Sequence, residues 1–76
     1  MEKEYKRGVT PDFSIEVVDL KHNIIELKYC KNKYELIEKI RRYKEEYNHE
    51  YRVKMYLLKK EKWCLFKTAV LKEIEL

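Results

Sequence analysis

Hydrophobic and polar residues alternate along four short stretches of this 76-residue chain, and a fifth stretch has helical spacing. From Phe13 to Val17 every second residue is apolar, and the same alternation returns from Ile24 to Cys30. Successive side chains of a strand point to opposite faces of a sheet, so a period of two predicts strands. Turn-forming residues lie between them in the segment Asp19–Asn23. We therefore expect a β-hairpin.

The run Lys33–Tyr47 has the spacing of an amphipathic helix of about four turns. Its apolar residues recur every three or four positions: Leu36, Ile37, Ile40, Tyr43 and Tyr47. Asn32 comes directly before the run, and Glu35 follows three positions later, which is an asparagine form of the capping box. The opposite face carries charges of both signs, as a solvent-exposed face does.

Two more alternating stretches follow the helix, Tyr51–Leu58 and Trp63–Leu71, with the charged turn Lys59–Lys62 between them. Both faces of this second hairpin carry apolar residues. Several of these must lie off the main core: Tyr56 and Leu58, with either the pair Trp63 and Leu65 or the pair Cys64 and Phe66. A second apolar face predicts either a surface for self-association or a core edge that is capped by Trp63.

The order of elements is therefore β-β-α-β-β. We expect an α/β (α+β) fold, with one long helix packed on a small mixed β-sheet. Seventy-six residues allow one domain, 1–76, with a small core. Residues 1–10 precede the first strand as a charged arm, which holds Gly8 and ends before Pro11.

The net charge of +4 argues against an acidic inhibitor protein that mimics DNA, and it fits a partner that carries phosphates. A densely ionic surface that only keeps a small protein soluble explains the same composition. No apolar run approaches the roughly 20 residues that span a bilayer, and the N-terminus has no signal-peptide pattern. We expect a cytoplasmic protein without membrane association, and the abundance of Lys, Ile, Tyr and Glu allows a viral origin.

The two cysteines, Cys30 and Cys64, lie in apolar surroundings and are expected to be buried free thiols. Together with His22 and His49 they include zinc-ligand residue types. However, no two of these four residues have the close paired spacing of zinc sites. One glycine in the whole chain excludes a glycine-rich phosphate loop, and we expect no small-molecule cofactor.

One constellation has the residue types for chemistry: Asp12 at the start of the first strand, with Glu26 and Lys28 in the second. Residues two apart in a strand share a face, so Glu26 and Lys28 project together. Two carboxylates suit Mg²⁺ or Mn²⁺, and an ammonium group beside a metal-bound water can assist its attack on a phosphodiester. Solvated charges on the outer face of a hairpin are the alternative interpretation.

The segments Thr-Pro-Asp-Phe at 10–13 and Ile-Ile-Glu-Leu-Lys at 24–28 resemble the signature of the PD-(D/E)xK nuclease superfamily, especially transposon-end endonucleases and archaeal Holliday-junction resolvases. The resemblance implies a restriction-endonuclease-like core and a metal-dependent DNA endonuclease, active as a dimer. It implies that Asp12, Glu26 and the carbonyl of Leu27 bind the metal ion, and that Lys28 is the catalytic lysine. Family members have a helix before the first strand, and we expect no such helix in the residues that precede Pro11 here.

The position of Asp12 depends on the first turn. If the loop spans Leu20–Asn23, Asp12 lies opposite Lys31, about 10 Å along the strand from Lys28. A turn centred near Asp19, or a bulge, would bring Asp12 closer.

Basic residues occur in clusters that can contact phosphates. We expect DNA contacts from the arm and from the helix: Lys3, Lys6, Arg7, Arg41, Arg42 and Lys44. Glutamates lie near each cluster, so solvated faces are an alternative. The rival hypothesis for the whole chain is a non-catalytic module that binds nucleic acid or protein through the arm and an open sheet face.

Overall fold

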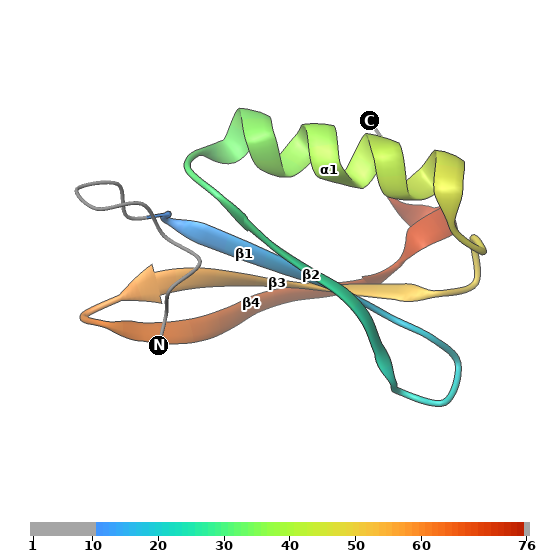
Figure 1. The fold of residues 1–76 in the computed structure, drawn as a ribbon, viewed down its shortest axis with the longest axis horizontal. Helices are drawn as coiled ribbons and strands as arrows, with labels where there is room; N and C mark the ends of the chain where they lie inside the picture. Colours follow the sequence, from blue (N-terminus) through green and yellow to red (C-terminus); the bar gives the residue numbers. More distant parts are fainter. Residues whose placement is uncertain (1–10, 76) are drawn as a thin grey trace.

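The computed structural model describes residues 11–75, so the arm at residues 1–10 lies outside the described residues. The elements follow the predicted order β-β-α-β-β, with a short 3-10 helix at the end (Figure 1). They are β1 (Phe13–Val18), β2 (Ile24–Cys30), α1 (Lys33–Glu46), β3 (Arg52–Lys59), β4 (Lys62–Val70) and η1 (Leu71–Glu73). The helix and all four strands agree with the sequence patterns to within a residue or two.

The four strands form one antiparallel sheet in the order β2-β1-β3-β4. The prediction of a mixed sheet is therefore wrong. Strands β2 and β3, which α1 connects, run in the same direction. Strand β1 lies between them and pairs with both, so the two parallel strands never pair with each other. The edges of the sheet are β2 and β4.

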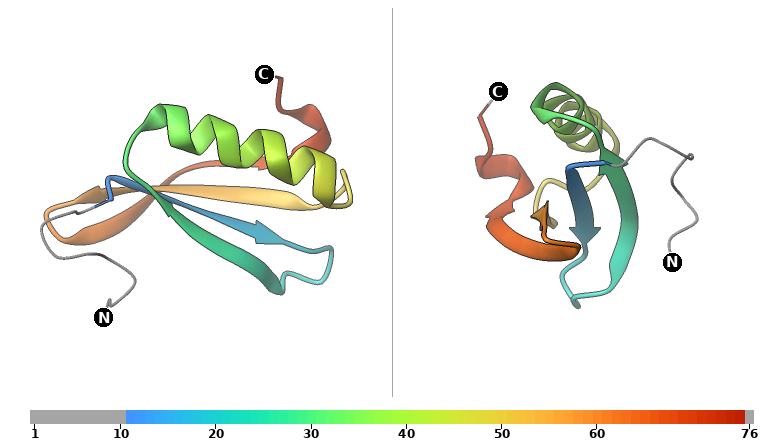
Figure 2. Two further views of the ribbon diagram at one scale, coloured as in Figure 1. Left: turned by 45° about the horizontal axis from the view of Figure 1, so that its top comes forward. Right: turned by 90° about the vertical axis from the view of Figure 1, so that its left-hand side faces the viewer.

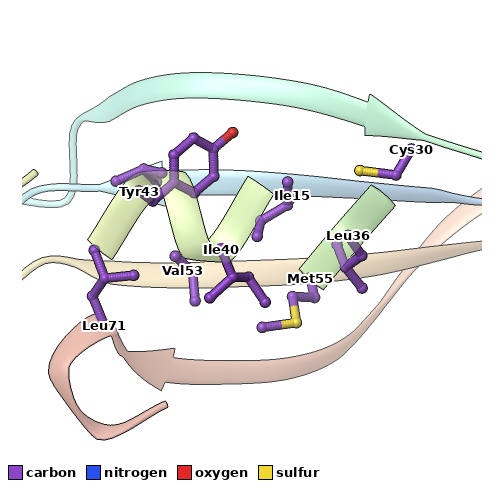
Figure 3. Packing of buried hydrophobic residues seen from close by; sticks show 9 residues of the cluster. Ile15, Cys30, Leu36, Ile40, Tyr43, Val53, Met55 and Leu71 are labelled. Carbon is purple, nitrogen blue, oxygen red and sulfur yellow. The ribbon is translucent and has the colours of Figure 1, made fainter. Parts of the chain in front are cut away.

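The main core lies between α1 and one face of the sheet (Figures 2 and 3). Directly paired residues of an antiparallel ladder share a face. Ile15 of β1 pairs with Met55 of β3, and both contact the apolar stripe of α1. Nine buried residues form this cluster: Ile15, Val17, Cys30, Leu36, Ile40, Tyr43, Val53, Met55 and Leu71. We call this side the helix-covered face and the other side the open face.

Local contacts hold the two ends of α1. At its start the side chain of Asn32 accepts a hydrogen bond from the backbone N–H of Glu35 at 3.0 Å. In return the Glu35 carboxylate accepts one from the backbone N–H of Lys31 at 2.9 Å. These bonds satisfy amide groups that the first turn leaves without partners. At the other end, Lys44 donates to the carbonyl of Ile74 at 2.5 Å and holds the C-terminal segment beside the helix.

The turns determine which residues pair. Asp19 closes the first turn by accepting hydrogen bonds from the backbone of Lys21 and Asn23, each at 2.9 Å. The second turn places Lys60 and Glu61 at positive φ, 48° and 67°, as a tight two-residue hairpin requires. Among the described residues, no helix is long and apolar enough to cross a membrane.

Candidate functional site

The strand pairing separates Asp12 from the other two residues of the predicted nuclease site. Phe13 pairs with Cys30, so the next position, Asp12, lies opposite Lys31. Glu26 pairs with Val17, five residues further along the hairpin, which corresponds to roughly 17 Å. The register shift in this hairpin occurs beyond Val17, towards the turn, and leaves the position of Asp12 unchanged.

Glu26 and Lys28 do share a face, as the strand period predicts. They lie on the helix-covered face, where the Lys28 ammonium is 3.5 Å from a Glu26 carboxylate oxygen. The hydroxyl of Tyr47 donates a hydrogen bond to the other oxygen of Glu26. This bond raises the pKa of Tyr47 to about 12, because the carboxylate stabilises the protonated phenol. The partners of Glu26 are thus an ammonium and a phenol.

These residues do not fit a shared divalent metal ion. Mg²⁺ binds oxygen ligands at about 2.1 Å, so two carboxylates roughly 17 Å apart along the hairpin cannot bind the same ion. Leu27, whose carbonyl the resemblance assigns to the metal, points its side chain to the open face. Within residues 11–75, no group of three or more His, Cys, Asp or Glu residues could hold a metal ion.

The basic residues of the helix are partly engaged in contacts with the protein itself. Arg41 forms an ion pair with Glu38 at 2.7 Å, and Lys44 donates to the Ile74 carbonyl. Arg42 is exposed. The remaining predicted DNA contacts, Lys3, Lys6 and Arg7, lie outside the described residues.

The open face of the sheet carries large exposed side chains. Leu27 pairs with Glu16, which places it on this face, and Ile25 lies two positions before it. At the opposite edge Leu65 pairs with Tyr56 on the same face. Ile25, Leu27 and Leu65 are 40%, 44% and 52% exposed, so both edges of the open face present aliphatic surface to solvent. Surfaces of this kind mark interaction sites.

An aromatic contact crosses the open face near the end of the sheet where β1 begins. The rings of Tyr29 on β2 and Trp63 on β4 have centroids 5.6 Å apart, although two strands lie between them. Ser14 of β1 pairs with Tyr29 and is only 4% exposed. Tyr56 completes the group and donates a hydrogen bond to Glu16 at 3.2 Å. Sequence alternation placed Trp63 and Leu65 together but left open which side of the hairpin they occupy.

A groove of about 900 Å³ lies on the other side of the sheet, between α1 and the hairpin of β3 and β4. Its lining is almost entirely carbon, with Lys33, Lys67 and Glu75 as the charged residues. Apolar side chains of α1 and of the strands face it, among them Leu36, Ile37, Ile40, Leu57 and Phe66. The sequence did not predict this groove, because periodicity reveals an apolar stripe but not how much of the sheet one helix covers.

Compared with protein-family models, with curated proteins and with solved structures, the chain matches none. The resemblance to PD-(D/E)xK nucleases therefore rests on the two short segments that contain Asp12, Glu26 and Lys28.

Proposed function

We propose that this protein is a non-catalytic interaction module that forms a homodimer through the open faces of two sheets. The observation that carries the proposal is the exposure of Ile25, Leu27 and Leu65 on that face, around the contact between Tyr29 and Trp63. An antiparallel sheet with one solvated face ordinarily presents polar residues there. Packing two such faces together would form a second core in the middle of the dimer.

The occupant we favour is a second copy of this chain. Four strands about 4.8 Å apart and about seven residues long present roughly 450 Å², so two faces bury roughly 900 Å² even as flat surfaces. Because side chains make each face uneven, the accessible area that the two faces bury exceeds the flat value and approaches the roughly 1,000 Å² of a specific interface. A small domain, with nine of the residues 11–75 in its main core, also gains much from such burial.

The distribution of charge on the open face supports a protein partner over a nucleic acid. By strand pairing, Arg52, Lys54 and Glu16 are its charged strand residues. Arg52 pairs with Val18 at the end of β1, and Lys54 pairs with Glu16 on the two middle strands. Ser14 and Thr68 are uncharged polar residues of the same face, and its other paired strand residues are aliphatic and aromatic. Two cations and one carboxylate give this face little net charge, whereas phosphate binding depends on many cations.

The endonuclease hypothesis receives less support. Its metal site requires Asp12 and Glu26 to meet, and the two residues belong to separate parts of the hairpin. We therefore prefer the binding module to the enzyme, and the dimer to DNA as its partner.

Sedimentation velocity across a concentration series tests the dimer. The variant Leu65→Glu should sediment as a monomer at concentrations where the wild type is dimeric, because it places a charge in the interface. Phe66→Glu is the matched control, since Phe66 is the neighbouring, equally exposed residue and lines the groove on the other side. A monomeric wild type at high micromolar concentration, or equal dimerisation of Leu65→Glu and wild type, would overturn the proposal.

Trp63 gives a second readout, because it is the sole tryptophan of the chain. On dimerisation its emission should shift to shorter wavelength and become less accessible to acrylamide. The shift should follow the same concentration dependence as sedimentation, and it should be absent in Leu65→Glu.

A further inference from the structure

The single helix covers only half of the sheet. An α-helix with its side chains is about 10 Å wide, whereas four strands about 4.8 Å apart need two helices side by side to be covered. The helix α1 packs against β1, β2 and η1 and also covers Val53 and Met55 in the first half of β3 (Figures 1 and 2). The second half of β3 and the strand β4 are less protected on this face. Phe66 of β4 and Ile37 of α1 are consequently 49% and 40% exposed.

The groove described above occupies this unprotected half. Leu57 and Phe66 form its floor, and Phe66 packs edge to face on Phe13 with ring centroids 6.1 Å apart. Ile37 and Leu36 form the wall on the helix side. The C-terminal segment closes one end, where the carbonyl of Ile74 accepts the hydrogen bond from Lys44. The groove is thus a preformed apolar trough beside an existing helix.

The lining restricts the chemistry of the occupant. A partner segment that lies in the groove meets carbon atoms almost everywhere and finds few groups for its own backbone N–H and C=O. An amphipathic helix satisfies its backbone internally, so it can bury one apolar face there without unpaired polar groups. Helices also pack beside one another on a sheet at spacings of 8–10 Å. An extended peptide would have to pair with the edge strand β4, where the bulge at Phe66 interrupts the regular ladder.

The charges around the groove indicate which sign of charge the partner helix should carry beside its apolar face. The lining of the groove includes two cationic residues, Lys33 and Lys67, and one carboxylate, Glu75. The nearby turn between β3 and β4 adds further cations, with Lys59, Lys60 and Lys62 around Glu61. We infer that the groove binds an amphipathic helix of about three turns from another protein, with acidic residues flanking its apolar face. The site goes beyond the proposed dimer, because it lies on the opposite side of the sheet and stays open in it.

A display library tests this inference. The probe is a set of helical peptides of about 14 residues, with apolar residues fixed at i, i+3, i+4 and i+7 and the flanking positions randomised, selected on the purified full chain. We expect enriched sequences to carry Asp and Glu beside the apolar stripe and to bind by fluorescence anisotropy. Their addition should shift amide NMR signals of Ile37, Leu57 and Phe66.

Substitutions on the two faces distinguish the two proposals. Phe66→Glu should weaken the selected peptides at least tenfold and leave dimerisation unchanged, whereas Leu65→Glu should abolish the dimer and leave peptide binding unchanged. Ile37→Asp offers an independent groove variant on an exposed position of α1. Failure to enrich any helix, enrichment of extended segments, or signal shifts confined to the open face would overturn the inference whether or not the protein dimerises.

Discussion

The hydroxyl of Tyr47, the residue that caps the C-terminal end of α1, donates a hydrogen bond to the carboxylate of Glu26 on the edge strand β2. This bond gives Glu26 a structural role in a position where a catalytic one was expected. Helix α1 and strand β2 are consecutive in the chain, but Tyr47 and Glu26 are 21 residues apart. The contact therefore stabilises the packing of the helix across the sheet.

Removing this hydroxyl should lower the stability of the fold. In Tyr47→Phe the carboxylate of Glu26 loses a donor while the aromatic packing of Tyr47 on Tyr43, at 5.7 Å between ring centroids, is kept. A hydrogen bond to a charged group at a partly exposed site contributes about 1 kcal/mol. Urea denaturation at neutral pH, followed by circular dichroism, should show a loss of this size. An unchanged midpoint would mean that solvent replaces the phenol at no cost.

The same bond predicts a loss of stability at high pH. The pKa of Tyr47 is about 12 in the folded protein, above its ordinary value of 10.0. The folded state thus holds the phenolic proton more tightly than the unfolded chain. The stabilisation is complete below pH 10 and is lost as the pH rises through 12.

The difference between wild type and Tyr47→Phe isolates this residue. Burial also raises the pKa values of Tyr43 and Tyr56, but both residues titrate in either protein. Denaturation at steps from about pH 9 to about pH 12 should show the steeper decline in the wild type. Parallel declines in the two proteins would contradict the assigned bond.

Local patterns predicted most of the secondary structure, because each element has local determinants in the chain. Alternation from Phe13 to Val17 and the cap at Asn32 were sufficient to locate the first strand and the start of the helix. The strand order was not predictable in this way. The pairing of β1 with β3 joins residues such as Ile15 and Met55, 40 positions apart, and no local pattern encodes a contact of that length.

The candidate site illustrates the same limit. Alternation showed that Glu26 and Lys28 share a face, and the ion pair at 3.5 Å agrees. It could not show that the helix covers that face, because this depends on which side of the sheet α1 crosses. The bulge at Phe66 likewise resolves a question left open by the sequence, since it places Leu65 on the open face and Phe66 in the groove.

The endonuclease hypothesis can be tested directly by measuring metal-dependent DNA cleavage. We expect no Mg²⁺- or Mn²⁺-dependent cleavage of supercoiled plasmid or four-way DNA junctions by the wild type, because Asp12 and Glu26 do not converge on one ion. The decisive comparison is Lys28→Ala against Lys31→Ala, a control at the end of the same hairpin. If Lys28→Ala abolished cleavage and Lys31→Ala retained it, the nuclease hypothesis would be supported again. The hairpin would then have to rearrange so that Asp12 and Glu26 meet.

The two cysteines should differ strongly in reactivity. Cys30 belongs to the core, and burial raises the pKa of its thiol, so little thiolate is accessible near neutral pH. Cys64 is exposed on the edge strand, contrary to the expectation that both thiols are buried. Reaction with a thiol-specific chromophore should show one fast thiol, absent in Cys64→Ser, and one that reacts only with unfolding. If both thiols of the folded wild type reacted fast, Cys30 would not be buried, and the packing of β2 under α1 would be contradicted.

A pair of isoleucines on the helix tests the distinction between core and groove. Ile40 is 4% exposed within the main cluster, whereas Ile37, one turn earlier, is 40% exposed on the groove wall. Ile40→Ala should lower the free energy of unfolding by about 3 kcal/mol, because it removes buried contacts and leaves a cavity. Ile37→Ala should cost about 1 kcal/mol or less, since its side chain is only partly buried. Urea denaturation of the two variants at one protein concentration gives the comparison, with helical circular dichroism as a check that both fold. Equal losses would mean that the groove is closed in solution and that Ile37 belongs to the core, which would also remove the site for a partner helix.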